Sequence, residues 1–406
     1  MQRSQIGFLF LNVGHFFDHL FILIFATVAA LRLTTEWGLS YAALVPYATP
    51  GFIAFGVFAI PAGWLADRWS REGMMAVFFI GIGFCALLAG LANSPLQIAL
   101  TLTLVGMFAA IYHPVGLAMV VEGRARTGVA LAVNGVFGNM GVATAALLTG
   151  FLIDTTGWRS AYFVPGAFSI GVGGLYILFL RRVGHEAASS RHKDGTDKPA
   201  APLVPAAPLV LPKSVLIRVF GIILFTTAIG GLVFQSTTFS LPKIFDERLT
   251  DLAGTATLIG WYVFLVFSTA AFAQLVVGYL IDRHSLRVVF AVVALSQAAF
   301  FYLMIHLDGV ASLLVAIAFM LAVFGQIPIN DVLVGRIARS EWRSRAYALR
   351  YIVTFSVSAS AVPLIAWIHG TRGFSTLFAL LAVAACLIFV AVLLLPDTNK
   401  QPVQQG

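Results

Sequence analysis

The chain has 406 residues, of which 60% are hydrophobic and only 10% are charged, and its formal net charge at pH 7 is +8. A soluble domain carries about 25% charged residues, so this composition excludes a water-soluble fold and indicates a protein that crosses the lipid bilayer several times. The Lys and Arg residues are spread over short loops, which argues against nucleic acid as a partner. We expect no cofactor, and we expect a monomer.

Twelve apolar runs, each long enough to cross a bilayer, follow one another along the chain. They cover residues 6–31, 42–66, 74–92, 96–122, 128–153, 161–181, 215–242, 255–281, 287–306, 310–335, 345–369 and 374–395. The only long polar stretch separates the sixth run from the seventh, and its sequence PAAPLVPAAPLVLP is typical of an extended linker. The predicted fold is therefore an all-α membrane protein with a six-helix bundle (1–181), a linker (182–214), a second six-helix bundle (215–396) and a tail (397–406).

The basic residues predict the orientation of these helices. If the N-terminus lies in the cytoplasm and the loops alternate, the outer side receives five of the 25 Lys and Arg residues and the cytoplasmic side receives the other 20. The five are Arg32, Arg159, Lys243, Arg248 and Arg372. This asymmetry follows the positive-inside rule, and an even number of spans then places both termini in the cytoplasm. We expect a multi-pass protein of the cell membrane, which in a bacterium is the inner membrane.

A short motif occurs once in each half of the chain. Residues 63–71 read GWLADRWSR and residues 278–287 read GYLIDRHSLR, and the two motifs start 215 residues apart. Each lies at the cytoplasmic end of the second helix of its half. A weaker echo, GFLIDTTGWR at 150–159, ends the fifth helix on the outer side. Matching elements at matching positions indicate an internal duplication.

This arrangement resembles the major facilitator superfamily of transporters, whose signature loop between helices 2 and 3 reads G-x-x-x-D-R-x-G-R-[KR]. The matching residues are Gly63, Asp67, Arg68 and Arg71 in the first copy and, approximately, Gly278, Asp282, Arg283 and Arg287 in the second. The resemblance implies two six-helix bundles related by a pseudo-twofold axis, and a latch at this loop that opens during alternating access. A run in the fourth span, IYHPVG, is weakly similar to bacterial fosmidomycin-resistance-type exporters.

The two aspartates of the motif have a physical role to play in such a latch. A carboxylate stabilises the positive N-terminal end of a helix. We therefore expect Asp67 to cap the eleventh helix and Asp282 to cap the fifth helix, each in the opposite bundle.

Three ionisable residues lie in the middle of the first span, in the stretch VGHFFDHLF. His15, Asp18 and His19 are spaced i, i+3 and i+4, so they share one face of a helix. Each ionisable group costs roughly 2.5–3.5 kcal/mol in a membrane helix, so this face predicts a functional site. A carboxyl kept from water and a histidine can both exchange protons near neutral pH. Proton coupling, with Asp18 as the proton carrier, is the leading interpretation.

Metal binding is the alternative interpretation of the same face. Two histidines at i and i+4 with a carboxylate between them could ligate a divalent transition metal, with His113 of the fourth span as the fourth ligand. The mid-membrane positions hold no cysteine, and the eight methionines form no M-x-x-x-M pair. The metal hypothesis is therefore the weaker one, and no metal site is expected.

Polar residues also flank a proline in the fourth span and in its counterpart, the tenth. His113 precedes Pro114, whereas Pro328 lies among three candidate cargo ligands, Gln326, Asn330 and Asp331. Paired kinks in corresponding helices indicate a binding or gating region. Further candidates are Asn134, Gln235 and Arg350. For Asn134 and Gln235, hydrogen bonding between helices is the competing interpretation. For Asp331 and Arg350, an ion pair between the two side chains is a simpler interpretation than cargo binding by Arg350.

These features together favour a secondary active transporter of a small solute, driven by protons and working by alternating access, with drug or metabolite export as one form. No Walker-type nucleotide motif is present, and the loops are too short for a catalytic domain, so an enzyme is not expected. The alternatives are a transporter of a divalent metal or a metabolite anion, and a non-transporting membrane sensor on the same frame.

Overall fold

A computed structural model of the chain describes residues 3–122, 127–190, 213–337 and 343–395, and these residues are almost entirely helical. The first half contains α1 (Arg3–Val28), η1 (Ala29–Leu33), α2 (Thr34–Trp37), α3 (Tyr41–Leu44), η2 (Val45–Ala48), α4 (Thr49–Arg68), α5 (Arg71–Gly90), α6 (Pro95–Ala109), η3 (Tyr112–Gly116), α7 (Leu117–Val121), α8 (Thr127–Thr155) and α9 (Ser160–Ser190). The second half contains α10 (Lys213–Arg248), α11 (Ala256–Arg283), α12 (Leu286–Met304), α13 (Gly309–Ile337) and α14 (Arg343–Leu393).

Eleven stretches of the described residues are long and apolar enough to cross a membrane, whereas the sequence predicts twelve. The difference arises in α14, where one stretch of 42 residues, Ile352–Leu393, replaces the last two predicted spans. A helix of that length would measure about 60 Å, roughly twice the thickness of the hydrocarbon core. Gly373 breaks it with a non-helical φ of 74° and ψ of 178°. A single glycine, rather than a loop, therefore separates the two predicted spans.

Helices extend into the predicted linker from both of its ends. Helix α9 continues to Ser190, past the predicted end of the sixth span at residue 181, and α10 begins at Lys213. Most of the predicted linker, residues 191–212, lies outside the described residues.

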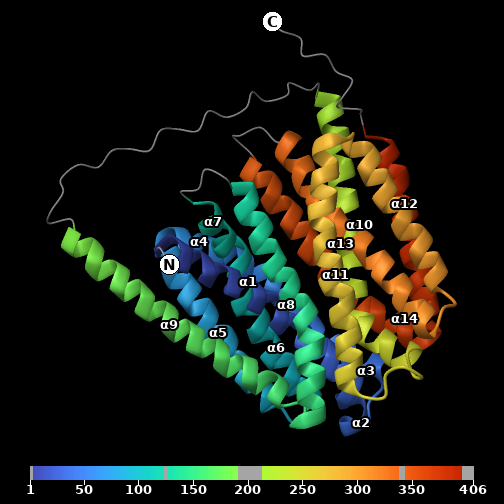
Figure 1. Ribbon diagram of the computed structural model, residues 1–406, viewed down its shortest axis with the longest axis horizontal. Coiled ribbons are helices and arrows are strands. Elements are labelled where there is room, and N and C mark those ends of the chain that lie inside the picture. Colours follow the sequence, from blue (N-terminus) through green and yellow to red (C-terminus); the bar gives the residue numbers. More distant parts are fainter. Residues whose placement is uncertain (1–2, 123–126, 191–212, 338–342, 396–406) are drawn as a thin grey trace, which may run out of the picture.

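Several pairs of elements join the two halves, and α3 packs against α14 among them. Helix α8 packs against α11, α4 against α14, and α1 against α10. Figure 1 shows α8 and α11 side by side in the middle of the molecule, with α9 at the edge of the first half and α12 at the edge of the second. Gly150 of α8 permits this close approach, because a Cβ atom added there would lie 2.2 Å from the carbonyl oxygen of Ala256.

Among the described residues, the apolar packing between the halves lies nearer one end of the bundle than the other. We call the end with Asp67 and Asp282 the latch end, and the end with Glu36 and Asp154 the far end. The largest buried apolar cluster crosses between the halves and includes Phe52 of α4 and Phe239 of α10, whose rings lie 5.9 Å apart. A second cluster at the latch end, which includes Ile281, contains only residues of the second half. The core that joins the halves is thus displaced towards the far end.

We predict that Gly373→Ala destabilises the protein. A side chain at this backbone conformation is strained by about 1–3 kcal/mol, because only glycine adopts it readily. The matched control is Gly174→Ala in α9, where an added Cβ meets nothing within 4 Å and the backbone is helical. Thermal unfolding in detergent should show a lower Tm for Gly373→Ala only. Equal Tm values for the two variants would contradict the role of Gly373 as the break between two spans.

Candidate functional site

The ionisable residues of α1 lie against the π-helical segment η3. Asp18 is fully buried, with 0% of its side chain exposed, and its Oδ2 atom lies 3.2 Å from Nε2 of His113. Neither carboxylate oxygen of Asp18 accepts a hydrogen bond of good geometry among the described residues. An acid and a base that the sequence places 95 residues apart are therefore in direct contact inside the protein.

His15 is held in a defined orientation by the neighbouring helix. Its Nδ1 atom lies 2.8 Å from the carbonyl oxygen of Asn134 in α8, and its ring stacks on Tyr112 with 4.8 Å between ring centres. A carbonyl oxygen only accepts, so Nδ1 carries the hydrogen and donates it. The lone pair of the ring is then on Nε2, which is buried and has no partner among the described residues.

Tyr112 and Asn12 complete the polar cluster, and neither was among the predicted site residues. The Tyr112 hydroxyl donates to the carbonyl oxygen of Leu11 at 2.8 Å and accepts from Nδ2 of Asn134 at 2.9 Å. Nδ2 of Asn134 also lies 3.0 Å from Oδ1 of Asn12. These bonds connect α1, η3 and α8, so Asn134 acts here as a support for the site. The position of Tyr112 directly before His113 was the available signal.

The backbone irregularity at η3 explains how Tyr112 and His113 reach α1. Residues Tyr112–Gly116 form a π-helix that contains Pro114, which has no N–H group to donate. Single-turn π-helices arise at such interruptions and occur often at functional sites. The corresponding proline of the second half, Pro328, lies within α13 without such a segment. The two halves therefore differ at this point.

The predicted polar residues of the second half form a separate cluster. Oε1 of Gln326 accepts from Nε2 of Gln297 at 2.7 Å, and Nε2 of Gln326 lies 3.5 Å from the carbonyl oxygen of Thr226. Oγ1 of Thr226 is 3.5 Å from Oδ1 of Asn330. These contacts favour a role for Gln326 in joining α10, α12 and α13.

Three further predicted residues have different outcomes. Gln235 of α10 is buried, and its amide nitrogen has no partner among the described residues. Asp331 and Arg350 belong to α13 and α14, but their side chains lie outside the described residues, so the predicted ion pair stays a prediction.

The His113 side chain faces the boundary between the halves. Its ring lies 5.7 Å from that of Phe55 in α4 and 5.8 Å from that of Phe355 in α14. The two phenylalanine rings are 4.8 Å apart. The acid–base pair of the first half is thus covered by an aromatic contact to the second half.

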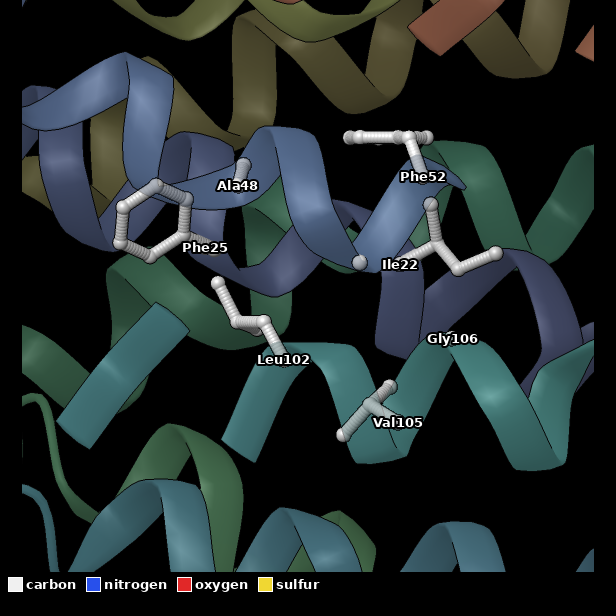
Figure 2. A pocket seen from close by; sticks show the side chains of 8 residues that line it. Ile22, Phe25, Ala48, Phe52, Leu102, Val105 and Gly106 are labelled. Atoms are coloured by element: carbon white, nitrogen blue, oxygen red, sulfur yellow. The ribbon is translucent and has the colours of Figure 1, made fainter. Parts of the chain in front are cut away.

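A small cavity lies elsewhere in the first half, between α1, α4 and α6 (Figure 2). It is lined by Ile22, Phe25, Ala48, Gly51, Phe52, Leu102, Val105 and Gly106 and has a volume of about 20 Å³. That is room for about one water molecule, and the side chains that line it are apolar. It therefore has neither the size nor the polar groups for a solute.

The signature motif at the latch end makes its ion pairs within the first half. Arg71 lies between Asp67, at 3.1 Å, and Glu122, at 3.3 Å. The predicted cap by Asp67 falls on the start of α14, where the side chains of residues 343–351 lie outside the description. Among the described residues, no hydrogen bond joins Asp282 to the start of α8.

The remaining arginines of the motif repeat one contact in both halves. Arg68 lies over the ring of Trp64 at 4.5 Å, and Arg283 lies over the ring of Tyr279 at 4.3 Å. The two pairs are 215 residues apart, as are the motif copies. Aromatic and basic residues are typical of the membrane–water interface, so these pairs fit helix ends at that depth.

The weak third copy of the motif makes the contact that we expected from the other two. Oδ2 of Asp154 accepts from the backbone N–H of Thr257 at 2.7 Å and from its hydroxyl at 2.5 Å. Thr257 lies in the first turn of α11, so a carboxylate of one half caps a helix of the other, at the far end. At the position 215 residues after Asp154, His369 packs on the ring of Tyr41 in the first half, with 5.1 Å between ring centres.

We predict that Asp154→Ala loosens the far end. The variant loses a helix cap worth about 0.5–2 kcal/mol. Asp251→Ala removes an exposed carboxylate at the same end that has no hydrogen bond or ion pair among the described residues. Thermal unfolding should give a lower Tm for Asp154→Ala than for Asp251→Ala. In the double variant Asp154→Ala/Thr257→Val, the Tm should be only slightly lower than in Asp154→Ala alone. If the losses in Tm of the two single variants add up fully in the double variant, the cap is contradicted.

We also predict that Gly138→Ala disturbs the site. A Cβ atom there would lie 2.6 Å from Nε2 of His15, so the ring must leave its bond to Asn134. In the control, Gly135→Ala on the same helix, the nearest atom is Oε1 of Gln274 at 3.7 Å. The Tm should fall for Gly138→Ala and stay near the wild-type value for Gly135→Ala. The reverse order would show that His15 is not held as described.

Comparison with known proteins places the chain in a family. The model of the Major Facilitator Superfamily matches residues 11–250 and again 244–406. The chain is 29% identical over 157 residues to a probable hexose phosphate transport protein of Chlamydia pneumoniae, and 26% identical over 145 residues to a gallate transporter of Pseudomonas putida. These alignments cover 38% and 35% of this chain and 34% and 32% of the relatives, so the chain matches about a third of their length.

Solved structures of similar fold are transporters as well. A D-xylose–proton symporter matches with a TM-score of 0.73 at 13% identity, over 98% of this chain and 99% of that one. A bacterial homologue of the human lysosomal transporter Spinster matches with a TM-score of 0.71 at 14% identity, over 97% of this chain and 98% of that one. The fold is therefore shared over nearly the whole chain. With the two matches of the family model, this shows that the chain is a multi-pass membrane protein and belongs to the major facilitator superfamily.

Proposed function

We propose that the chain is a proton-coupled secondary transporter of a small organic solute, with Asp18 and His113 as the groups that carry the proton. Membership of the family supports transport, and the contact between these two side chains supports coupling to protons. The contact is the observation that carries the proposal. It places a carboxylate and an imidazole 3.2 Å apart inside two membrane helices.

The burial of Asp18 gives this contact its importance. An ionised carboxylate without water is unfavourable unless a cation or a proton accompanies it. His113 offers the matching base, and a proton can reside on either side chain. Opening the boundary between the halves would uncover His113, because Phe355 of the second half packs against its ring. Proton exchange would in this way follow the movement of the two halves.

The joined far end supports alternating access. Contacts between the halves at this end include the cap that Asp154 places on α11 and the packing of Tyr41 on His369. At the latch end, the ion pairs of Arg71 stay within one half. Such a structure corresponds to a state closed at the far end. By the positive-inside rule we assign the latch end to the cytoplasm, together with both termini.

An organic anion is the solute class that we favour. Three curated relatives are named for hexose phosphate, gallate and 4-hydroxybenzoate, which are anions rich in oxygen acceptors. Two buried amides near the boundary, Asn139 in α8 and Gln235 in α10, each have a nitrogen without a partner among the described residues. These N–H groups would suit carboxylate, phosphate or hydroxyl oxygens of a solute.

Proton movement in liposomes tests the proposal. The purified protein is reconstituted with a pH-sensitive dye inside, and gallate, 4-hydroxybenzoate and hexose 6-phosphate are added in turn. We expect one of these solutes to drive proton movement in the wild type. Asp18→Asn should reduce it to the level of empty liposomes, because an amide cannot take up and release the proton.

The matched control is Asp251→Asn, which changes an exposed aspartate at the far end in the same way. It should behave as the wild type does. Solute-driven proton movement that persists in Asp18→Asn would contradict the assigned carrier, whereas solute uptake without any proton movement in the wild type would contradict proton coupling.

A further inference from the structure

Three imidazoles meet next to the Asp18–His113 pair. The rings of His15, His19 and His113 lie 5.0, 5.6 and 5.7 Å apart, measured between ring centres. One nitrogen of each ring lies within 4.8 Å of one nitrogen of each of the others. No hydrogen bond within the described part of the chain gives the His19 side chain a structural role.

The spacing of the ring centres fits one metal ion. A point at equal distance from three centres with these separations lies about 3.1 Å from each of them. An ion bound at 2.0–2.1 Å to an imidazole nitrogen lies about 3.2 Å from the centre of that ring. The ligand nitrogens all lie within 4.8 Å of one another, and small movements of the rings would bring them towards the roughly 3.3 Å that a tetrahedral site requires.

One of the imidazoles already makes the outer hydrogen bond that metal-binding histidines make, and a second lies beside a carboxylate. A ligating histidine commonly donates its other ring N–H to a backbone carbonyl or a carboxylate, which fixes the direction of its lone pair. His15 makes this bond to the carbonyl of Asn134 at 2.8 Å, and His113 has Oδ2 of Asp18 at 3.2 Å. Nε2 of His15, in a side chain with 7% exposed, is buried without a partner among the described residues.

From this geometry we infer that His15, His19 and His113 form a binding site for one divalent transition-metal ion. Neutral imidazoles favour ions of the zinc, cobalt, nickel and copper group over calcium and magnesium, which prefer oxygen ligands. Three histidines leave a fourth coordination position for water or for an oxygen of another ligand. The proposal concerns binding alone and does not rest on the proposed function.

Cobalt is the probe, because imidazole-bound Co²⁺ absorbs visible light and reports its ligands. The full chain is purified in detergent, its affinity tag is removed, and CoCl2 is added stepwise. We expect one Co²⁺ per protein molecule, with an absorption band that ZnCl2 abolishes by displacement. Zinc should also raise the Tm of the wild type, since a ligand that binds the folded state stabilises it.

Two sets of variants assign the site. His15→Gln and His19→Gln should each weaken Co²⁺ binding by at least about 10–100-fold, with the band lost at one equivalent. His284→Gln and His306→Gln change exposed histidines outside the cluster and should keep the band. Size-exclusion profiles and metal-free Tm values identify any variant that fails to fold, and His19, which is only half-buried, is the milder of the two changes.

The outcomes that overturn the site are equally direct. A wild type without a saturable Co²⁺ band at one equivalent contradicts it. So does a band that survives both His15→Gln and His19→Gln, or one that disappears in His284→Gln. Because the titration needs neither a proton gradient nor a solute, its failure leaves the transport proposal untouched, and a failure of transport leaves the metal site untouched.

Discussion

A polar side chain within the bilayer must find its partner inside the protein, because the lipid supplies none. In this chain the constraint acts most strongly on the span that contains α1. In its most apolar 18-residue stretch, 72% of the residues are buried inside the protein, a larger share than in any other described span. Protein rather than lipid surrounds this helix, so His15, Asp18 and His19 can be kept there. Their partners come from η3 and α8, and the packing of these three elements follows from the bonds that His15 and Asp18 require.

The internal duplication gives the two halves the same order of helices, but the copies of the motif make different contacts. Asp67 pairs with Arg71 in its own half, whereas Asp154, in the weakest copy, caps a helix of the opposite half. The free N–H groups at a helix N-terminus can donate to a carboxylate equally well at either end of the bundle. Among the described residues, such a contact between the halves is formed at the far end.

The sequence predicts the membrane spans and the division into two halves well, because hydropathy and the repeated motif can be recognised within short stretches of sequence. The i, i+3, i+4 spacing of His15, Asp18 and His19 was enough to place them on one face. The sequence indicated His113 as a possible neighbour of this face, but it did not predict the direct contact between His113 and Asp18. Nor did it predict the pairing of Gln326 with Gln297, because both contacts depend on tertiary packing. The sequence predicts two separate spans on either side of Gly373. That a single residue breaks the helix there is visible only in the backbone dihedral angles.

If Asp18 carries the proton, a carboxyl inside α1 gains and loses a proton as the protein works. Infrared difference spectroscopy on the reconstituted protein observes this most directly, because a protonated carboxyl has its own C=O stretching band. In the difference between spectra recorded at low and high pH, we expect a carboxyl band for the wild type. This band should be absent from Asp18→Asn and present in Asp251→Asn. A wild-type difference spectrum that Asp18→Asn reproduces would contradict it.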